Sequence, residues 1–195
     1  NVAFDAAQFV YEDVCIEGLN HPGEVLAPTE AYRSTLRGAR VAGATLRRWV
    51  LEDCRVEDSD LSNAVLSECT LLRVTFVRCR LVGVDWRLLS QLLLSVAFVD
   101  CRLSLSNFAG MGLRGTSFRD SQATEVDFTR TDLRDADFSG TDLHGSLFAS
   151  TGLEGADLSR AENDDVDPSN NRVSGAVFSL QAAVRMVERF GIVVA

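Results

Sequence analysis

A large apolar residue recurs every five positions along most of the chain, and this period limits the possible folds more than any other feature. Two positions before it stands a second, mostly small residue, as Ala136 stands before Phe138 and Thr141 before Leu143. In the second half only Ala123 interrupts the large-residue series. The members of the series there are Leu88, Leu93, Phe98, Leu103, Phe108, Leu113, Phe118, Phe128, Leu133, Phe138, Leu143, Phe148, Leu153 and Leu158.

A five-residue period fits neither of the regular secondary structures. The inward face of an α-helix recurs about every 3.6 residues, and the faces of a strand alternate about every 2. If each unit is instead a short extended side that ends at a corner, the large and the small residue point inward and the other three face solvent. One such unit cannot bury its apolar face alone, so successive units must stack. The sequence therefore predicts an all-β solenoid.

An earlier series follows the same rule in a different phase. It begins at Leu36, and the step from its last member, Trp86, to Leu93 takes seven residues instead of five. Together the two series hold about 26 units, hence roughly six coils, and a spacing of about 4.8 Å per coil gives a rod on the order of 30 Å long. The predicted segments are a first repeat run at 36–86, a bulge or small loop at 87–93 and a second repeat run at 94–160.

Several units match a known repeat signature. Residues 136–140 read Ala-Asp-Phe-Ser-Gly, residues 141–145 read Thr-Asp-Leu-His-Gly, and residues 156–160 read Ala-Asp-Leu-Ser-Arg. These units resemble the A(D/N)LXX signature of pentapeptide-repeat proteins. The resemblance implies a right-handed quadrilateral β-helix, in which four units make one coil and the Leu or Phe series stacks along the centre. Residues twenty apart would then lie directly above one another.

The last 35 residues lose the period and carry helix signals, so we expect a connector and a helix within 161–195. Ser179 is a good N-cap residue, and Gly191 is a suitable stop. The helix would either cap the last coil or form a self-complementary dimer contact. The apolar residues expected at that dimer contact are Phe178, Leu180, Val184, Val187, Phe190 and Ile192.

Three segments resemble a narrower group within this family. Residues 76–86, 167–172 and 178–180 are similar to parts of the proteins that protect DNA gyrase, namely the Qnr type and the albicidin-resistance type. The likeness departs where Gln181 and Ala182 replace the Pro-Glu commonly found there. It implies a homodimeric DNA mimic that binds DNA gyrase or topoisomerase IV. Such a protein protects the enzyme from a poison such as a fluoroquinolone or an albicidin-like compound and confers antibiotic resistance.

Residues 1–35 are predicted to form an N-terminal cap and a loop. A five-residue step continues there in a third phase, from Phe4 to Leu19, but acidic residues such as Glu17 occupy its small-residue positions. Carboxylates are poor inward residues. Residues 20–29 contain two prolines and one glycine, which favours a loop.

The charge pattern differs between the two runs when residues twenty apart are compared. In the first run opposite charges stack, as in Asp53 below Arg73. In the second run like charges stack, as in Asp100 below Asp120, and stacked like charges destabilise a sheet. The net charge of −9 at pH 7 disfavours nucleic acid as a ligand and favours a basic groove on a protein partner.

Two interpretations of the stacked acids stay open. One is a solvated surface that maintains solubility, and the other is an anionic rod that presents carboxylates where a protein expects DNA phosphates. In the second interpretation either the bulge at 87–93 or the N-terminal loop would contact the enzyme near the drug. The partner-binding acidic face would consist of Asp100, Asp120, Glu125, Asp127, Asp132, Asp135, Asp137, Asp142 and Asp157, and the partner-binding loop of Arg87, Leu88, Leu89, Ser90, Gln91 and Leu92.

The sequence offers no sign of an enzyme, a cofactor or a metal site. Ser146 occupies the small inward series, so it cannot act with the outward His144 as nucleophile and base. Four of the five cysteines also occupy that series, which predicts buried thiols, and the odd count favours a reducing cytoplasm. No apolar run approaches the length of a membrane span. The alternative function is a pentapeptide-repeat scaffold with an unrelated protein partner, because a fold alone does not determine function.

Overall fold

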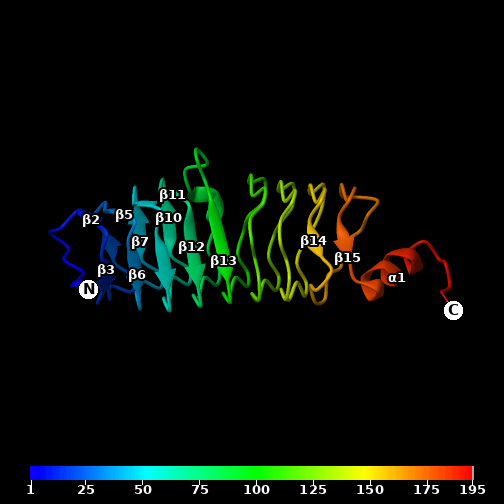
Figure 1. Cartoon of the computed structure of the whole chain (residues 1–195), viewed down its shortest axis with the longest axis horizontal. Coiled ribbons are helices and arrows are strands. Elements are labelled where there is room, and N and C mark those ends of the chain that lie inside the picture. Colours follow the sequence, from blue (N-terminus) through cyan, green and yellow to red (C-terminus); the bar gives the residue numbers. More distant parts are fainter. Residues whose placement is uncertain (195) are drawn as a thin grey trace.

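The computed structural model describes residues 1–194, which wind into a rod of stacked coils (Figure 1). About eight coils form a parallel β-solenoid, and the helix α1 (Leu180–Glu188) follows at its C-terminal end. Most paired residues are twenty apart in sequence, as Val10 and Glu30 are. The predicted all-β solenoid with a C-terminal helix is confirmed. The coils outnumber the roughly six expected because the N-terminal segment also winds into coils.

Every coil has four sides, which we label A to D in chain order. In the first half, side A is a four-stranded sheet, side B a six-stranded sheet and side D a three-stranded sheet, while single bridges hold side C. Because the chain visits the sides in turn, A lies opposite C and B lies opposite D. Side A contains β2 (Val10–Glu12), β5 (Glu30–Tyr32), β8 (Val50–Glu52) and β11 (Thr70–Leu72); side B contains β1 (Val2–Ala3), β3 (Cys15–Glu17), β6 (Thr35–Arg37), β9 (Arg55–Glu57), β12 (Val74–Val77) and β13 (Val96–Val99); side D contains β4 (Val25–Leu26), β7 (Thr45–Arg47) and β10 (Val65–Ser67).

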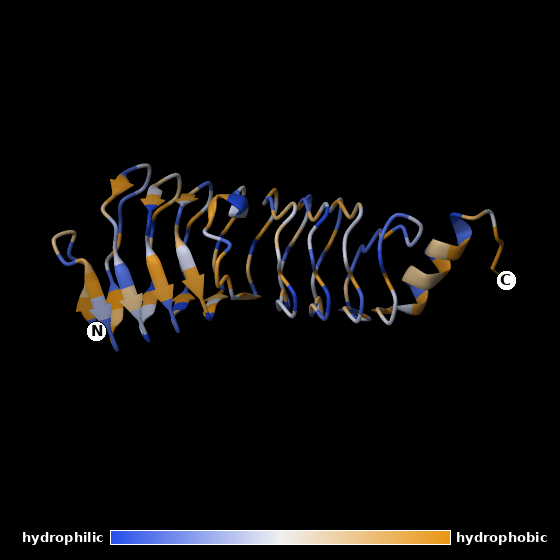
Figure 2. Ribbon diagram, turned by 90° about the horizontal axis from the view of Figure 1, so that it is seen from above, coloured by the Kyte–Doolittle hydropathy of each residue, from blue (hydrophilic) through white to orange (hydrophobic). Residues whose placement is uncertain are grey.

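Beyond β13 most sides shorten to one paired residue each. On side A, for example, Asp132 pairs with Gly112 and Gly152. Only side B regains short strands, β14 (Asp157–Leu158) and β15 (Val177–Phe178). Apolar and polar residues follow one another within every coil, and apolar residues continue into α1 and the tail beyond it (Figure 2).

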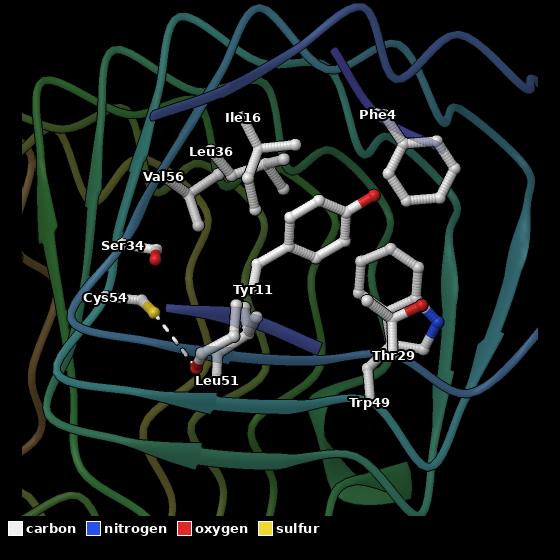
Figure 3. Close-up of a pocket in the computed structure, with 11 residues that line it drawn as sticks. Phe4, Tyr11, Ile16, Thr29, Ser34, Leu36, Trp49, Leu51, Cys54 and Val56 are labelled. Carbon is white, nitrogen blue, oxygen red and sulfur yellow. Dashed lines mark hydrogen bonds between the residues drawn. The ribbon is translucent and has the colours of Figure 1, made fainter. Parts of the chain in front are cut away.

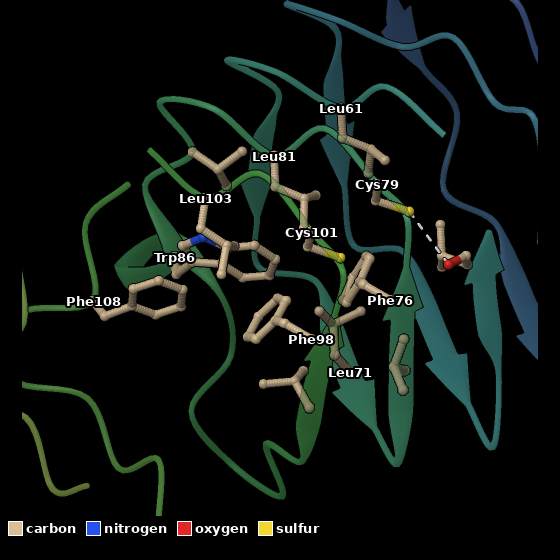
Figure 4. Close-up of a cluster of buried hydrophobic side chains, with 14 of the residues drawn as sticks. Leu61, Leu71, Phe76, Cys79, Leu81, Trp86, Phe98, Cys101, Leu103 and Phe108 are labelled. Atoms are coloured by element: carbon tan, nitrogen blue, oxygen red, sulfur yellow. Dashed lines mark hydrogen bonds between the residues drawn. The ribbon is translucent and has the colours of Figure 1, made fainter. Parts of the chain in front are cut away.

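The inward aromatic residues form two parallel ladders inside the rod (Figure 4). On side B, Phe98 stacks on Phe118 with ring centroids 5.4 Å apart, and Phe118 stacks on Phe138 at 4.9 Å. On side D, Phe108 stacks on Phe128 at 5.5 Å. The two ladders meet edge to face, as Phe108 and Phe118 do at an interplanar angle of 87°. Both geometries are favoured by the ring quadrupole, so the ladders fix each coil on the next.

The corners between sides place residues in the left-handed region. The last residue of most corners has a positive φ, as in Asp120 at 55° and Gly140 at 70°. A Cβ makes this conformation costly, and Gly, Asn and Asp adopt it most readily. Acids and arginines occupy many of these corners, so their side chains begin from a strained backbone and lie at the edges of the rod.

Three corner acids lie against a glycine one coil further along. A Cβ added to Gly140 would lie 2.3 Å from Asp120 Oδ1, and one added to Gly155 would lie 2.6 Å from Asp135 Oδ1. The corner carboxylate therefore leans along the rod axis into space that only glycine leaves open. The three pairs are Asp120 with Gly140, Glu125 with Gly145 and Asp135 with Gly155.

Two additional residues enter the coil that joins the two runs. β12 pairs with β9 at a separation of twenty residues, but Val74 pairs with Val96 at twenty-two. The 3₁₀ helix η1 (Trp86–Leu88), which follows side D, and the loop after it on side A accommodate the difference, and the loop projects above the rod in Figure 1. Within the predicted partner-binding loop of residues 87–92, Leu89 is only 5 % exposed, because it occupies an inward position of the coil.

The N-terminal segment differs from its prediction as a cap and loop. Residues 20–29 contain β4, and Asn20 pairs with Arg40 across side C. The inward series of the first run continues back through Leu26, Ile16 and Tyr11, all buried. The sequence pattern missed this phase because His21 interrupts it. The ring of His21 packs instead against Phe4, edge to face at 5.9 Å.

Phe138→Ala tests the aromatic ladders. We expect the free energy of unfolding to fall by about 3–5 kcal/mol, because the substitution leaves a cavity between stacked rings. Leu147→Ala is the matched control, since Leu147 is 58 % exposed and its loss should change stability by about 0.5 kcal/mol or less. Denaturant unfolding measures both. Equal stability of Phe138→Ala and the unsubstituted protein would contradict the central position of the ring.

Gly140→Ala tests the pairing of corner acids with glycines. We expect a loss of about 2 kcal/mol or more, since the positive φ alone costs about 1–2 kcal/mol and the Cβ also meets Asp120. Gly110→Ala, at φ 74° with no neighbouring atom within 4 Å, should show the cost of the conformation alone. In a double-mutant cycle of Gly140→Ala with Asp120→Gly, a coupling below about 0.3 kcal/mol would show that the contact is absent.

Candidate functional site

Ser146 and His144, which are close together in the sequence, do not form a catalytic pair. Ser146 is buried, and its Oγ donates to the carbonyl of Ala123 at 2.5 Å and accepts from Val126 N at 3.0 Å. His144 is exposed. Within residues 1–194 no cluster of three or more His, Cys, Asp or Glu side chains could hold a metal ion. In the same part of the chain, no helix is both long enough and apolar enough to cross a membrane.

The N-terminal coils enclose a small apolar cavity (Figure 3). Its volume is about 10 Å³, and its lining includes Phe4, Tyr11, Trp49 and Cys54. A space of this size holds at most about one water molecule, and its apolar wall offers such a water no partners. The cavity therefore belongs to the core, and the candidate functional site lies on the outer surface.

The predicted acidic face divides into two structural kinds. The first kind occupies the paired position of a side, and its carboxylate accepts the backbone N–H two residues later. Asp127 accepts from Thr129 N at 2.8 Å, and Asp137 accepts from Ser139 N at 2.9 Å. These bonds close the corner that follows, as Asp commonly does in turns. The members of this kind are Asp127, Asp132, Asp137, Asp142 and Asp157.

The second kind occupies the corners and is exposed. Its members are Asp100, Asp120, Glu125 and Asp135, each with a positive φ.

The nine predicted acids do not share one face. Residues of the paired kind lie on all four sides: Asp132 on side A, Asp137 and Asp157 on side B, Asp142 on side C and Asp127 on side D. The corner acids lie on three of the four edges. The reason is the coil itself, because acids five residues apart in sequence fall on successive sides.

Arginines neutralise the acids next to side A. Arg134 pairs with Asp132 at 2.6 Å and lowers the pKa of that carboxyl, and Arg114 pairs with Asp135 at 2.9 Å. The edge between sides B and C differs. Within the described residues Asp100 and Asp120 form no ion pair, and Asp137 has only Arg119 at 3.6 Å. We call the six acids of this region the acidic edge; they are Asp100, Asp120, Asp137, Asp142, Asp157 and Glu162.

The first run is neutralised along its length, as the sequence predicts. Arg73 binds Asp53 Oδ2 at 2.8 Å, and Arg78 binds Asp58 with contacts of 2.7 and 3.0 Å. These guanidinium contacts lower the pKa of both carboxyls. Arg48 likewise binds Glu68 at 2.9 Å. Within the described residues, the acids of the second run that form no ion pair are Asp100, Asp120, Glu125, Asp127, Asp142 and Asp157, and four of these six belong to the acidic edge.

We call residues 87–93 the leucine loop, and this loop lies on a different side of the rod from the acidic edge. Leu88, Leu92 and Leu93 are 43 %, 76 % and 64 % exposed, and they project from side A, which is opposite side C. Arg87 pairs with Asp85 at 2.7 Å at the foot of the loop. A partner that contacts both surfaces would have to reach around the rod.

The C-terminal helix exposes the stripe that the sequence assigns to a cap or a dimer. Ser179 Oγ accepts from Ala182 N at 3.1 Å and begins α1. Leu180 is 76 % exposed and Phe190 is 63 % exposed, so the stripe covers little of the last coil. Of the other predicted contact residues, Val187 and Ile192 are exposed, and Phe178 and Val184 are half-buried.

Comparisons with known proteins agree with this architecture. The chain superimposes on solved structures of QnrB1, a plasmid-mediated fluoroquinolone resistance protein; one trypsin-treated form gives a TM-score of 0.69 at 20 % identity over 96 % of this chain and 98 % of that chain. Full-length QnrB1 gives a TM-score of 0.53 at 21 % identity over 95 % and 98 % of the two chains. These similarities concern the fold. A search of curated protein sequences gave no match.

The sequence also matches a protein-family model. The model for pentapeptide repeats matches eight copies, at residues 50–85, 101–140 and 127–162. The matched residues coincide with coils of the solenoid, and together they span half of the chain. The protein belongs to the pentapeptide-repeat family.

Proposed function

We propose that this protein binds DNA gyrase or topoisomerase IV as a DNA mimic and protects the enzyme from a poison such as a fluoroquinolone or an albicidin-like compound. Antibiotic resistance would follow from that protection. The observation that carries the proposal is the acidic edge, a run of carboxylates along the rod of which only Asp137 forms an ion pair within the described residues. The full-length likeness in fold to QnrB1 supports it.

The spacing of the acidic edge suits DNA mimicry. Its six carboxylates lie on four successive coils, and at about 4.8 Å per coil this is roughly one charge per 3 Å of rod. Phosphates on one strand of B-DNA are spaced by about 3.4 Å along the axis. A basic groove that accepts a DNA strand would therefore meet a similar charge density on this edge.

The other two exposed surfaces have roles in the same model. The leucine loop would contact the enzyme near the bound drug, and its apolar side chains supply contact area that the acidic edge lacks. The apolar stripe of α1 would pair with the same stripe of a second copy, giving a homodimer. We place the protein in the cytoplasm, where the enzyme acts on DNA and where free cysteines such as Cys15 stay reduced.

Assays of supercoiling by gyrase and of decatenation by topoisomerase IV test the proposal. Each purified enzyme is inhibited with a fluoroquinolone, and the protein is added over a range of concentrations. We expect it to restore activity. The Asp100→Asn/Asp120→Asn variant should need roughly two- to thirtyfold more protein for the same effect, because two exposed charge contacts at about 0.2–1 kcal/mol each are lost.

The matched control is Asp13→Asn/Asp53→Asn. It removes the same charge from one corner of the N-terminal segment and one corner of the first run, so protection should be nearly unchanged. Equal loss in both variants would point to net charge rather than the acidic edge. No protection of either enzyme would reject the proposal, and affinity capture of another stable partner would then favour the scaffold alternative.

Val184→Glu/Phe190→Glu tests the dimer. We expect a monomer at concentrations where the unsubstituted protein is a dimer, because two buried carboxylates would face each other across the contact. Light scattering coupled to size exclusion measures the mass. Ser174→Glu is the control, since it changes an exposed position on a coil outside the stripe. A dimer that survives the double substitution would place the contact elsewhere.

A further inference from the structure

A simple capping helix would pack its apolar stripe against the last coil, but the helix α1 turns its more apolar stripe toward solvent. Ala182, Arg185, Met186 and Arg189 share one stripe, because the last three follow Ala182 by three, four and seven residues. This stripe faces the solenoid: Ala182 is buried, Met186 packs against the core, and both arginines bind acids of the preceding connector. The more apolar stripe faces solvent. Its exposed members are Leu180, Ala183, Val187 and Phe190.

One of the two arginine contacts is anchored in the protein interior. Arg185 Nη2 donates to Asp164 Oδ1 at 2.5 Å and to the Asp164 carbonyl at 3.1 Å. The side chain of Asp164 is 1 % exposed, whereas that of Arg185 is 46 % exposed. Asp164 Oδ2 is buried and has no hydrogen-bond partner. The carboxylate therefore depends on Arg185 for its compensation.

The contact between Arg189 and Asp165 can be compared with the contact between Arg185 and Asp164. Arg189 pairs with Asp165, whose side chain is 69 % exposed. Exposed pairs contribute little, while a buried charge without its partner is strongly destabilising. Burial raises the pKa of Asp164 even though Arg185 opposes the shift. The charged groups around this carboxyl are Arg185 on α1 and Asp165 on the connector.

The buried carboxylate opposes the rotation of α1 that the hydrophobic effect favours. Turning the helix to cover its apolar stripe would withdraw Arg185 from Asp164 and leave a bare charge in the interior. The observed orientation instead satisfies the charge and leaves Leu180 and Phe190 in solvent. A helix that served only as a cap would not need this arrangement.

We propose that Asp164 and Arg185 are positioning residues that hold α1 with its apolar stripe outward, ready for a second copy of this chain. This inference rests on the homodimer proposed above. A second copy is the fitting occupant, because a twofold contact brings a stripe onto itself and uncharged apolar stripes are self-complementary. Arg185 and Arg189 are both engaged with the connector and do not interrupt the stripe.

Two measurements on the full chain at pH 7.5 test the inference. Hydrogen exchange of α1 reports whether the helix is held, and light scattering reports the dimer. Arg185→Gln leaves the carboxylate of Asp164 bare, so we expect exchange in α1 to accelerate at least about tenfold and the dimer to weaken at least about tenfold. Exchange in the aromatic coils at 96–160 should not change.

Three further variants make the test specific. Arg189→Gln removes the same charge from the same helix, and its exchange should stay within about threefold of the unsubstituted protein. Arg185→Lys keeps the charge and should retain much of the protection. Asp164→Asn combined with Arg185→Gln removes the bare carboxylate and should slow the exchange again. Lowering the pH should also bring the exchange of Arg185→Gln closer to that of the unsubstituted protein measured at the same pH, because protonation of Asp164 removes its charge.

The outcomes separate this inference from the proposed dimer. Equal exchange in Arg185→Gln and Arg189→Gln would overturn the positioning role, whatever the oligomeric state. A monomeric unsubstituted protein would overturn the dimer as occupant, while the exchange comparison would still decide whether the pair holds the helix. Loss of the dimer in Arg185→Gln without faster exchange in α1 would also overturn the proposed mechanism.

Discussion

The stacking of each coil on the coil twenty residues earlier is the constraint on which the rest of the molecule depends. Asp132 N donates to Met111 O of the preceding coil at 2.8 Å, and Leu133 N donates to Gly152 O of the following coil at 2.7 Å. The aromatic ladders keep the same register inside. Every outward side chain therefore has its neighbours decided by the residues twenty before and twenty after it. Outward residues twenty apart in sequence therefore form columns along the rod, and the residues in each column decide whether that column is neutral or charged.

Many acids of the second run have structural roles in the coils that do not depend on a partner. A carboxylate at the paired position closes a corner, and a corner carboxylate fills the space left by a glycine. These roles explain why acids recur at the two positions without reference to function. What they leave unexplained is that Asp100 and Asp120 form no ion pair within the described residues, because the nearby Arg78 and Arg119 bind Asp58 and Asp137, whereas Arg114 and Arg134 neutralise the acids near side A. That difference between edges, rather than the number of acids, is the feature of the surface that points to a binding role.

The five-residue period was sufficient to predict the solenoid, its corners and the position of the extra residues near Trp86. It was not sufficient to predict which acids form ion pairs, because the positions alone do not show which neighbour a long arginine side chain reaches. Arg114, for example, pairs with Asp135, which is twenty-one residues away on the next coil. The N-terminal coils were missed because His21 occupies an inward position where the pattern requires an apolar residue. The pair between Asp164 and Arg185 lies outside the repeats, where no period relates the two residues.

The leucine loop and α1 display apolar side chains by the same physical means. In the loop, Leu89 is buried and the ion pair between Arg87 and Asp85 holds the chain that carries the exposed leucines. In α1, Ala182 is buried and Arg185 binds Asp164 while the apolar stripe stays in solvent. In each case one small buried contact and one ion pair oppose the tendency of the apolar residues to fold back onto the rod. Surfaces held in this way need little reordering when they bind, so more of the contact energy is available to affinity.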